Sequence, residues 1–390
     1  MSPVKNDPSS GKQHAILAER VFDGHRWHAQ AAVMIRDGRV AGIGSWNELA
    51  KDWPQTQLQG ATFLAPGFID LQVNGGGGVL LNDQPTADSM RAIARAHRRF
   101  GTTACLPTLI TDTRERVQAA IAAARSVSSR DGVIGLHLEG PFISPKRPGV
   151  HRPDRIVQPV AGDLEQLCEL AGAGQSMVTL APECVPAGFV RTLAASGVRV
   201  SIGHSEASAA TVMQAVADGA TGITHLFNAM PPLSAREPGI VGAALYDEET
   251  WCGIIVDGHH VDPIMLKLAL RCKRHDRFML VTDAMPAVGC AEPTFVLQGR
   301  TIRVVDGICR DENGTLAGTA LDMAAAVRNA VSLLGLDIVE AARMASEYPA
   351  EFLGLGSELG RIAPGYRANL VLMNDDLEVQ KTWIEGVASV

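Results

Sequence analysis

Short apolar runs separated by turn pairs mark both ends of the chain. Within residues 15–44, Asp23-Gly24 and Asp37-Gly38 separate the apolar runs, a pattern that predicts two β-hairpins of a small antiparallel sheet. Residues 365–390 repeat the pattern, with a turn at Asn374-Asp375-Asp376 between two apolar runs. We therefore expect both chain ends to be rich in β-strands.

Between these ends, short apolar runs alternate with alanine-rich stretches whose apolar residues recur every three or four positions. This alternation indicates βα units and a parallel sheet. About eight runs are candidate strands, the number that closes a (β/α)8 barrel. They are residues 63–73, 103–109, 133–138, 177–181, 198–202, 222–225, 252–256 and 278–282. The clearest outer helices are residues 86–100, 113–129, 163–173 and 208–218.

The predicted fold class is α/β, a (β/α)8 TIM-type barrel with a small β-sandwich domain formed by both chain ends. We assign residues 63–358 to the barrel and residues 1–62 and 359–390 to the small domain. Turn pairs at Asp306-Gly307 and Asn313-Gly314 predict a β-hairpin insertion near residues 291–316. A length of 390 residues fits a barrel with one small appendage.

Composition and charge narrow the class of protein. Hydrophobic residues make up 46% and charged residues 20%, which excludes a disordered chain. The net charge of −7 comes without a basic block, which argues against nucleic acid or a membrane surface as partner. The 7 cysteines are scattered and never form Cys-x-x-Cys, so no disulfide framework is indicated. Residues 1–13 are polar, and we expect a soluble, cytoplasmic enzyme.

Four ligand-type residues follow predicted strands. Glu139, His204, His225 and Asp283 end the third, fifth, sixth and eighth strands. Singly, each has a plainer explanation, such as a structural histidine or a helix N-cap. Jointly they point to a metal site, because the strand ends of a barrel converge on one face and these side chains suit Zn²⁺ or Fe²⁺.

The chemistry that these residues predict is hydrolysis of an amide. Glu139, His204 and His225 are the expected metal ligands, and three protein ligands leave an open position for water. Asp283 is the expected general base and acid, which accepts the proton of the water and passes it to the leaving amine.

Several strings in the chain resemble the N-acetylglucosamine-6-phosphate deacetylases of the amidohydrolase superfamily, and the resemblance spans the whole chain. The strings are Ala65-Pro66-Gly67-Phe68-Ile69-Asp70, Leu136-His137-Leu138-Glu139-Gly140-Pro141-Phe142, Gly203-His204-Ser205, Thr224-His225-Leu226-Phe227-Asn228-Ala229-Met230 and Val281-Thr282-Asp283-Ala284. The resemblance implies hydrolysis of N-acetyl-D-glucosamine 6-phosphate to D-glucosamine 6-phosphate and acetate, in amino-sugar catabolism or cell-wall sugar recycling. It also implies the same metal ligands and the same role for Asp283.

The resemblance further implies a set of substrate contacts. His151, next to Val150, is expected to polarise the acetyl carbonyl. The sugar phosphate is expected to contact Asn228, Ala229, Arg236 and His260, and an arginine fork with an imidazole suits a phosphate. The sugar and acetyl pocket is expected to be lined by Leu316, Ala317 and Gly318. The resemblance also implies a homodimer in which Arg236 reaches the neighbouring site.

Gln72-Val73-Asn74 bears on the number of metal ions. Many amidohydrolases have His-x-His at this place, where it binds a second metal, whereas amides are poor ligands for transition metals. We therefore expect one divalent ion per subunit, Zn²⁺ first, with Fe²⁺, Mn²⁺ and Co²⁺ as alternatives. The following Gly75 to Gly78 lack the lysine of a phosphate-binding loop. His137 is assigned to packing.

Three other functions stay open at this point. N-acetylgalactosamine-6-phosphate deacetylase shares the strings above and differs only in the sugar epimer. A D-aminoacylase or dihydroorotase usually needs the His-x-His pair and often a lysine after the fourth strand, where this chain has Ala181-Pro182-Glu183. A barrel that binds sugar phosphates without catalysis would not need Asp283.

Overall fold

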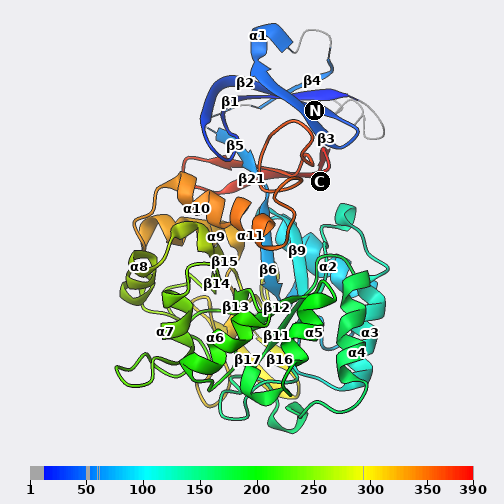
Figure 1. Ribbon diagram of the computed structural model, residues 1–390. Coiled ribbons are helices and arrows are strands. Elements are labelled where there is room, and N and C mark those ends of the chain that lie inside the picture. Colours follow the sequence, from blue (N-terminus) through cyan, green and yellow to red (C-terminus); the bar gives the residue numbers. More distant parts are fainter. Residues whose placement is uncertain (1–12, 50–52, 59, 61, 293, 390) are drawn as a thin grey trace.

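The computed structural model describes residues 13–49, 53–58, 60, 62–292 and 294–389 (Figure 1). Of the polar segment predicted at residues 1–13, only Gln13 lies within the described residues. In this described part of the chain, no helix is long and apolar enough to span a membrane.

Strands from both chain ends form one separate eight-stranded sheet, as the patterns predicted. The first three strands make two antiparallel hairpins, and the last three join them through β5, which pairs with both β1 and β20. Figure 1 shows the blue and red segments together at one end of the molecule, beyond the barrel and its surrounding helices. The elements are β1 (His14–Phe22), β2 (Trp27–Arg36), β3 (Arg39–Ser45), α1 (Trp46–Leu49), β4 (Gln55–Gln57), β5 (Thr62–Pro66), β20 (Leu370–Asn374), β21 (Val379–Ile384) and β22 (Val387–Ala388).

Gly67 divides the first predicted barrel strand in two. Instead of one strand over residues 63–73, β5 ends at Pro66 and β6 (Phe68–Val73) begins after one intervening residue, in a different sheet. The Gly67 amide donates to Asn369 O at 2.9 Å, and a side chain at Gly67 would collide with Thr103. The apolar run is continuous in sequence, but at this glycine the chain passes from the end sheet into the barrel.

Eight parallel strands form the barrel, in the order β15-β14-β13-β12-β11-β10-β9-β6. A parallel bridge between Val73 and Ala284 brings the two edges together. The third strand is shorter than predicted, because before His137 only one isolated bridge, from Val133 to Cys105, remains. The other strands are β9 (Thr102–Ile110), β10 (His137–Glu139), β11 (Met177–Leu180), β12 (Arg199–Ile202), β13 (Gly222–Ile223), β14 (Trp251–Ile254) and β15 (Phe278–Leu280).

Helices surround the strands and bury their apolar faces in one large core (Figure 1). Several begin at a side chain that accepts a backbone N–H of the first turn, such as Thr86, Thr113 and Ser208, which ends the preceding loop. The helices are α2 (Ala87–Arg98), α3 (Arg114–Ala124), α4 (Asp163–Cys168), α5 (Phe189–Ala195), α6 (Ala209–Ala217), α7 (Gly239–Tyr246), α8 (Pro263–Cys272), α9 (Met323–Ser332), α10 (Ile338–Met344) and α11 (Glu347–Phe352).

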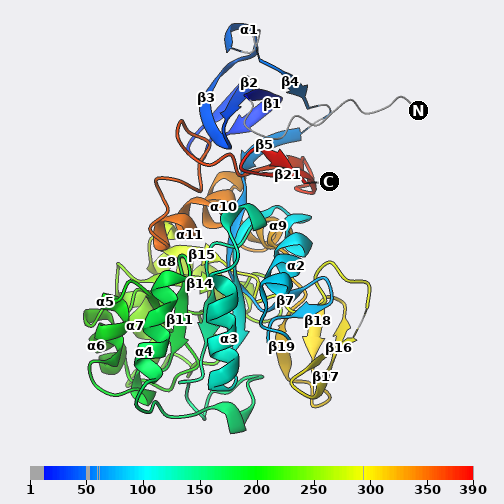
Figure 2. The same cartoon turned by 90° about the vertical axis from the view of Figure 1, so that its right-hand side faces the viewer.

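The segment with the predicted hairpin turns forms a four-stranded antiparallel sheet at one side of the barrel (Figure 2). Leu316 to Gly318 belong to its last strand, and Thr319 bridges to Ala284 beside the catalytic candidate Asp283. The strands are β16 (Thr294–Leu297), β17 (Arg300–Val305), β18 (Ile308–Arg310) and β19 (Leu316–Thr319). A short pair, β7 (Gly75–Gly76) and β8 (Val79–Leu80), follows β6.

Candidate active site

The four strand-end residues meet at the carboxyl end of the barrel. Glu139 is the last residue of β10, and His204 and His225 follow β12 and β13 by two residues each. Asp283 follows β15 by three residues. Since the strands are parallel, their last residues share one face of the barrel, and Glu139, His204 and His225 are all buried there.

Three of these residues have left-handed backbone conformations. The φ angles are 48° at His204, 31° at His225 and 51° at Asp283. Such conformations cost non-glycine residues of the order of 1–3 kcal/mol each and persist only where neighbours fix them. A backbone N–H donates to each carbonyl: from Ser144 to His204 at 2.8 Å, from Asn228 to His225 at 2.9 Å and from Thr319 to Asp283 at 3.0 Å. The sharp turns that present these side chains are thus held by the adjoining loops.

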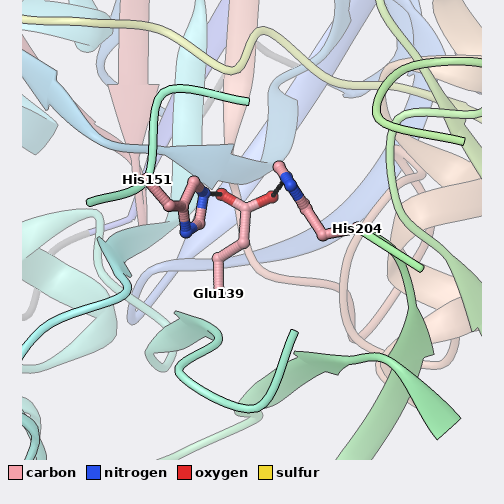
Figure 3. Close-up of side chains that lie close together, drawn as sticks. All are labelled: Glu139, His151 and His204. Carbon is pink, nitrogen blue, oxygen red and sulfur yellow. Dashed lines mark ion pairs between the residues drawn. The ribbon is translucent and has the colours of Figure 1, made fainter. Parts of the chain in front are cut away.

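The side chains of Glu139, His204 and His225 are in direct contact. The Nε2 atom of His225 lies 3.0 Å from Glu139 Oε1 and 3.0 Å from His204 Nε2. His204 Nε2 lies 3.3 Å from the same Glu139 oxygen. Figure 3 shows Glu139 between His204 on one side and His151 on the other. Two ring nitrogens and a carboxylate oxygen therefore converge on one small volume.

The orientation of His204 is fixed by the backbone. Its Nδ1 atom lies 2.8 Å from the carbonyl oxygen of Arg147. A carbonyl only accepts, so Nδ1 carries a proton, and in the neutral ring the lone pair is then on Nε2, the atom nearest Glu139. Histidines that bind metals characteristically donate their other N–H to such an acceptor.

The donor set fits a divalent cation. Glu139, His151 and His204 each offer a ligand atom within 4.8 Å of the others, and His225 Nε2 adjoins the same carboxylate. Within the described ranges, Glu139 pairs with no lysine or arginine. Burial opposes ionisation of Glu139, but the adjacent imidazoles of His151, His204 and His225 outweigh it and hold its pKa well below the usual value. The site concentrates electron pairs that a cation can neutralise.

His151 lies beside this set and has two candidate roles. Its Nε2 atom is 3.7 Å from Glu139 Oε2, and its Nδ1 atom is 2.7 Å from Thr111 Oγ1. Burial, and next the charge of His204, lower the pKa of His151 to about 4, so the ring is neutral at neutral pH. Because a hydroxyl both donates and accepts, Thr111 allows Nε2 either to carry a proton for a substrate oxygen or to bind a metal.

Asp283 is held by two side-chain amides, those of Gln72 and Asn74. Oδ1 of Asp283 accepts from Asn74 Nδ2 at 2.6 Å and from Gln72 Nε2 at 3.2 Å. Gln72 Nε2 also lies 3.0 Å from Glu139 Oε1. Burial, and next the charge of Glu139, raise the pKa of Asp283 to about 6. A carboxyl group with this pKa can take up and release a proton near neutral pH.

The predicted phosphate residues lie in two loops. Asn228 and Ala229 follow His225 directly, and Asn228 Nδ2 donates to His225 O at 3.1 Å. His260 Nδ1 lies 2.6 Å from Asp257 Oδ2, and this bond helps to hold the pKa of Asp257 at about 2 although burial opposes it. The Arg236 side chain is exposed and makes no hydrogen bond or ion pair with any described residue. Its own chain does not bring Arg236 into the cluster.

The four-stranded side sheet contributes to the site from β19. A Cβ atom at Gly318 would lie 2.8 Å from Asp283 O, so the backbone of β19 approaches Asp283 more closely than another residue type allows. Ala317 is buried and Leu316 is partly exposed. Arg300 of β17 donates to the carbonyl of Val150, the residue before His151. The side sheet therefore contacts both the base candidate and the loop of His151.

His137, which the sequence assigned to packing, is buried and also belongs to a polar network. Its Nδ1 atom lies 3.1 Å from Thr108 Oγ1 and its Nε2 atom 2.8 Å from Thr179 Oγ1. Thr224 Oγ1 continues the chain, 2.7 Å from Thr179 Oγ1 and 2.7 Å from Ser201 Oγ. Polar residues in otherwise apolar strands were the signal that could have revealed this network. Its members His137, Ser201 and Thr224 precede Glu139, His204 and His225 by two, three and one residues.

Comparison with known proteins identifies the family. The model of the amidohydrolase family matches residues 63–388. The chain belongs to the amidohydrolase family. Members of this family depend on metal ions, and this amidohydrolase has a candidate metal site at Glu139, His151 and His204.

Relatives of this amidohydrolase carry two names. The N-acetylgalactosamine-6-phosphate deacetylase of Shewanella sp. is 44% identical over 91% of this chain and 90% of its own length. The N-acetylglucosamine-6-phosphate deacetylase of Haemophilus influenzae is 35% identical over 91% of this chain and 93% of its own. A solved structure of N-acetylglucosamine-6-phosphate deacetylase from Pasteurella multocida superimposes with a TM-score of 0.92 at 35% identity, covering 97% of this chain and 100% of that one. The barrel with its separate end sheet is thus the fold of these enzymes.

Proposed function

We propose that this amidohydrolase removes the acetyl group of N-acetyl-D-glucosamine 6-phosphate and releases D-glucosamine 6-phosphate and acetate. The observation that carries the proposal is the convergence of Glu139, His204, His225 and Asp283 at one end of the barrel. The names of the similar proteins support the substrate class, a small amino-sugar phosphate.

Glu139, His204 and His225 are the residues that would hold the metal ion, one per subunit, with Zn²⁺ first and Fe²⁺, Mn²⁺ or Co²⁺ as alternatives. When bound, a divalent ion lowers the pKa of a water molecule and polarises an amide carbonyl. His204 supports this assignment, since its Nδ1 atom donates to the Arg147 carbonyl and the neutral ring then offers Nε2 to a metal. A single ion is supported by Gln72 and Asn74, whose amide N–H groups face Asp283.

Asp283 is the proposed proton carrier. Both amide donors contact its Oδ1 atom, which leaves Oδ2 to accept the proton of the attacking water. The same oxygen then returns the proton to the nitrogen of the departing amino sugar, which leaves as an amine. His151 is proposed to donate from Nε2 to the acetyl oxygen, with Val150, Leu316, Ala317 and Gly318 around the acetyl and sugar groups.

The phosphate group is proposed to contact Asn228, Ala229 and His260 of one subunit and Arg236 of a second subunit. Exposed apolar side chains support a homodimer. They lie in the segment before α7, at its end and along α8: Leu233 is 49% exposed, Tyr246 81%, Ile264 72% and Leu268 44%. Figure 1 shows α7 and α8 on the same side of the barrel. Large exposed apolar groups of this kind are typical of interfaces. The cytoplasmic location stays a prediction.

N-acetylgalactosamine 6-phosphate is the second candidate substrate, and the 44% identical relative from Shewanella favours it. The experiment is a comparison of kcat/KM on the two sugar phosphates with the metal-loaded enzyme. Our proposal expects the higher kcat/KM on the gluco epimer. A clear preference for the galacto epimer would make N-acetylgalactosamine 6-phosphate the substrate. If neither sugar phosphate is hydrolysed, the proposed function is wrong.

A further inference from the structure

Asp70 is a buried carboxylate that the proposed reaction does not use. It lies in the middle of β6, is fully buried, and pairs with no lysine, arginine or histidine in the part of the chain that the structure describes. Its three hydrogen bonds all come from two residues. Oδ2 accepts from Thr282 Oγ1 at 2.5 Å, and Oδ1 accepts from the backbone N–H of Gln72 at 3.2 Å and of Thr282 at 3.3 Å.

These two partners adjoin the proton carrier. Thr282 directly precedes Asp283, and the side chain of Gln72 donates to Asp283 Oδ1. The Asp283 amide also donates to Gln72 O at 3.0 Å, and the Thr282 hydroxyl lies 3.3 Å from the same carbonyl. One buried carboxylate therefore ties the end of β6 to the residues after β15, where the barrel closes.

Stability alone does not account for a carboxylate at this place. A buried charge without a cationic partner is unfavourable, and burial, opposed by the bond from Thr282, raises the pKa of Asp70 to about 7. Asp283, in contrast, needs a firm anchor, because its φ of 51° is a strained conformation. Buried charged groups that lower stability are found where they position the reacting groups of an active site.

We propose that Asp70 is a positioning residue for Asp283. Through Thr282 and Gln72 it keeps Oδ1 of Asp283 against the amides of Gln72 and Asn74 and leaves Oδ2 directed to proton transfer. The inference rests on the proposed function, since it concerns the same reaction. Asp70 acts through its neighbours and touches neither substrate nor metal.

The variants Asp70→Ala and Asp70→Asn separate anchoring from charge. Alanine removes every acceptor, whereas asparagine keeps Oδ1 for the two backbone N–H groups. Its Nδ2 atom can then donate to the Thr282 hydroxyl, which turns to Gln72 O. We expect Asp70→Ala to lower kcat about 30- to 100-fold with KM and metal content within about threefold of wild type. Asp70→Asn should restore kcat to within about fivefold.

If Asp70→Ala does not fold, Thr282→Val tests the same contact, because it keeps the side-chain volume and removes only the hydroxyl that donates to Asp70. The double variant Asp70→Asn/Thr282→Val should lose no more than Thr282→Val alone. Thr103→Val is the matched control: its buried hydroxyl also bonds to β6, at Phe68 O, two residues before Asp70. This variant should keep kcat even where its melting temperature falls.

Kcat within threefold of wild type in both Asp70→Ala and Thr282→Val would overturn the inference while the proposed function stood. A loss of kcat matched by equal loss of metal, or failure of asparagine to rescue, would also overturn it, because Asp70 would then serve the fold or the metal site. A metal-loaded wild type that releases no acetate would overturn the proposed function and the inference together.

Discussion

The side-chain amide of Asn74 donates to Oδ1 of Asp283 across 2.6 Å, although 208 residues lie between them in the chain. The contact joins β6 to the segment after β15, the two edges at which the barrel closes. An amide nitrogen that donates has no lone pair for a metal. The Asn74 amide nitrogen is therefore used to hold the carboxyl group of Asp283, the proposed proton carrier.

Asp283→Asn should leave the metal bound and lower kcat by about 10²- to 10⁴-fold, because the side chain can no longer accept a proton. The measurement is steady-state acetate release together with the metal content of the purified variant. Asp337→Asn, at the N-cap of α10, is a control that keeps an amide in place of a carboxyl far from the site. Turnover near the wild-type rate in Asp283→Asn would remove this residue from the mechanism.

His225→Asn and His151→Asn should affect different quantities. His225 Nε2 adjoins both Glu139 and His204, so its loss should empty the metal site. His151 lies farther from the carboxylate, at 3.7 Å, and its loss should lower kcat by about 10²-fold with metal retained. The metal-to-protein ratio after dialysis distinguishes the two. Equal loss of metal in both variants would make His151 a ligand.

Arg236→Ala should lower kcat/KM for the 6-phosphorylated sugar by about 10- to 100-fold, because a charged hydrogen bond to phosphate is lost. The unphosphorylated N-acetyl sugar is the control substrate and should be unaffected. An equal loss on both substrates would mean that Arg236 does not bind the phosphate.

Mixing of two variants tests whether Arg236 acts across a dimer. A hybrid of Arg236→Ala and Asp283→Asn subunits has one site with Asp283 from the first and Arg236 from the second. We expect activity on the phosphorylated sugar to rise when the two proteins exchange subunits. No rise, despite hybrid formation shown by differently tagged subunits, would place Arg236 outside the neighbouring site.

The rate should fall on the acid side with an apparent pKa at or below about 6, the value to which burial and Glu139 raise the Asp283 pKa. Asp283 acts as a base only when it is ionised, so activity is full above this pKa and is lost as the pH falls through it. A bound cation lowers the pKa of Asp283 further. Asn74→Ala removes a donor to the ionised form and should move this limb to higher pH. The pH profile of kcat/KM measures the acid-side pKa in the wild type and in the variant. If this pKa is the same in both, the acid-side loss of activity does not come from Asp283.

The sequence was sufficient to predict which side chains meet at the candidate site, because barrel geometry constrains where strands end. An apolar run precedes each of the four residues Glu139, His204, His225 and Asp283. Because the strands of a closed barrel are parallel, their carboxyl ends lie together on one face. The same reasoning found the end sheet from its turn pairs. These features depend on local pattern and on one global rule.

Other features depend on contacts between distant segments. The division of the first strand at Gly67 follows from the proximity of Thr103, which the apolar run does not encode. Gln72 was predicted only as a residue that does not bind metal, whereas it donates to Glu139 and Asp283. Asp70 is part of the string Ala65 to Asp70 that carries the family resemblance, but the sequence predicted no role for it. Its partner Thr282 is far away in the chain, at the other edge of the barrel.

Acetate release before and after metal removal tests the central claim most directly. Purified enzyme is assayed on N-acetyl-D-glucosamine 6-phosphate as prepared, after chelation, and after refilling with one equivalent of Zn²⁺, Fe²⁺, Mn²⁺ or Co²⁺ per chain. We predict one acetate for each free amine formed, loss of turnover on chelation and recovery with a single equivalent. Full turnover by metal-free protein, or no acetate from the reloaded enzyme, would contradict the account.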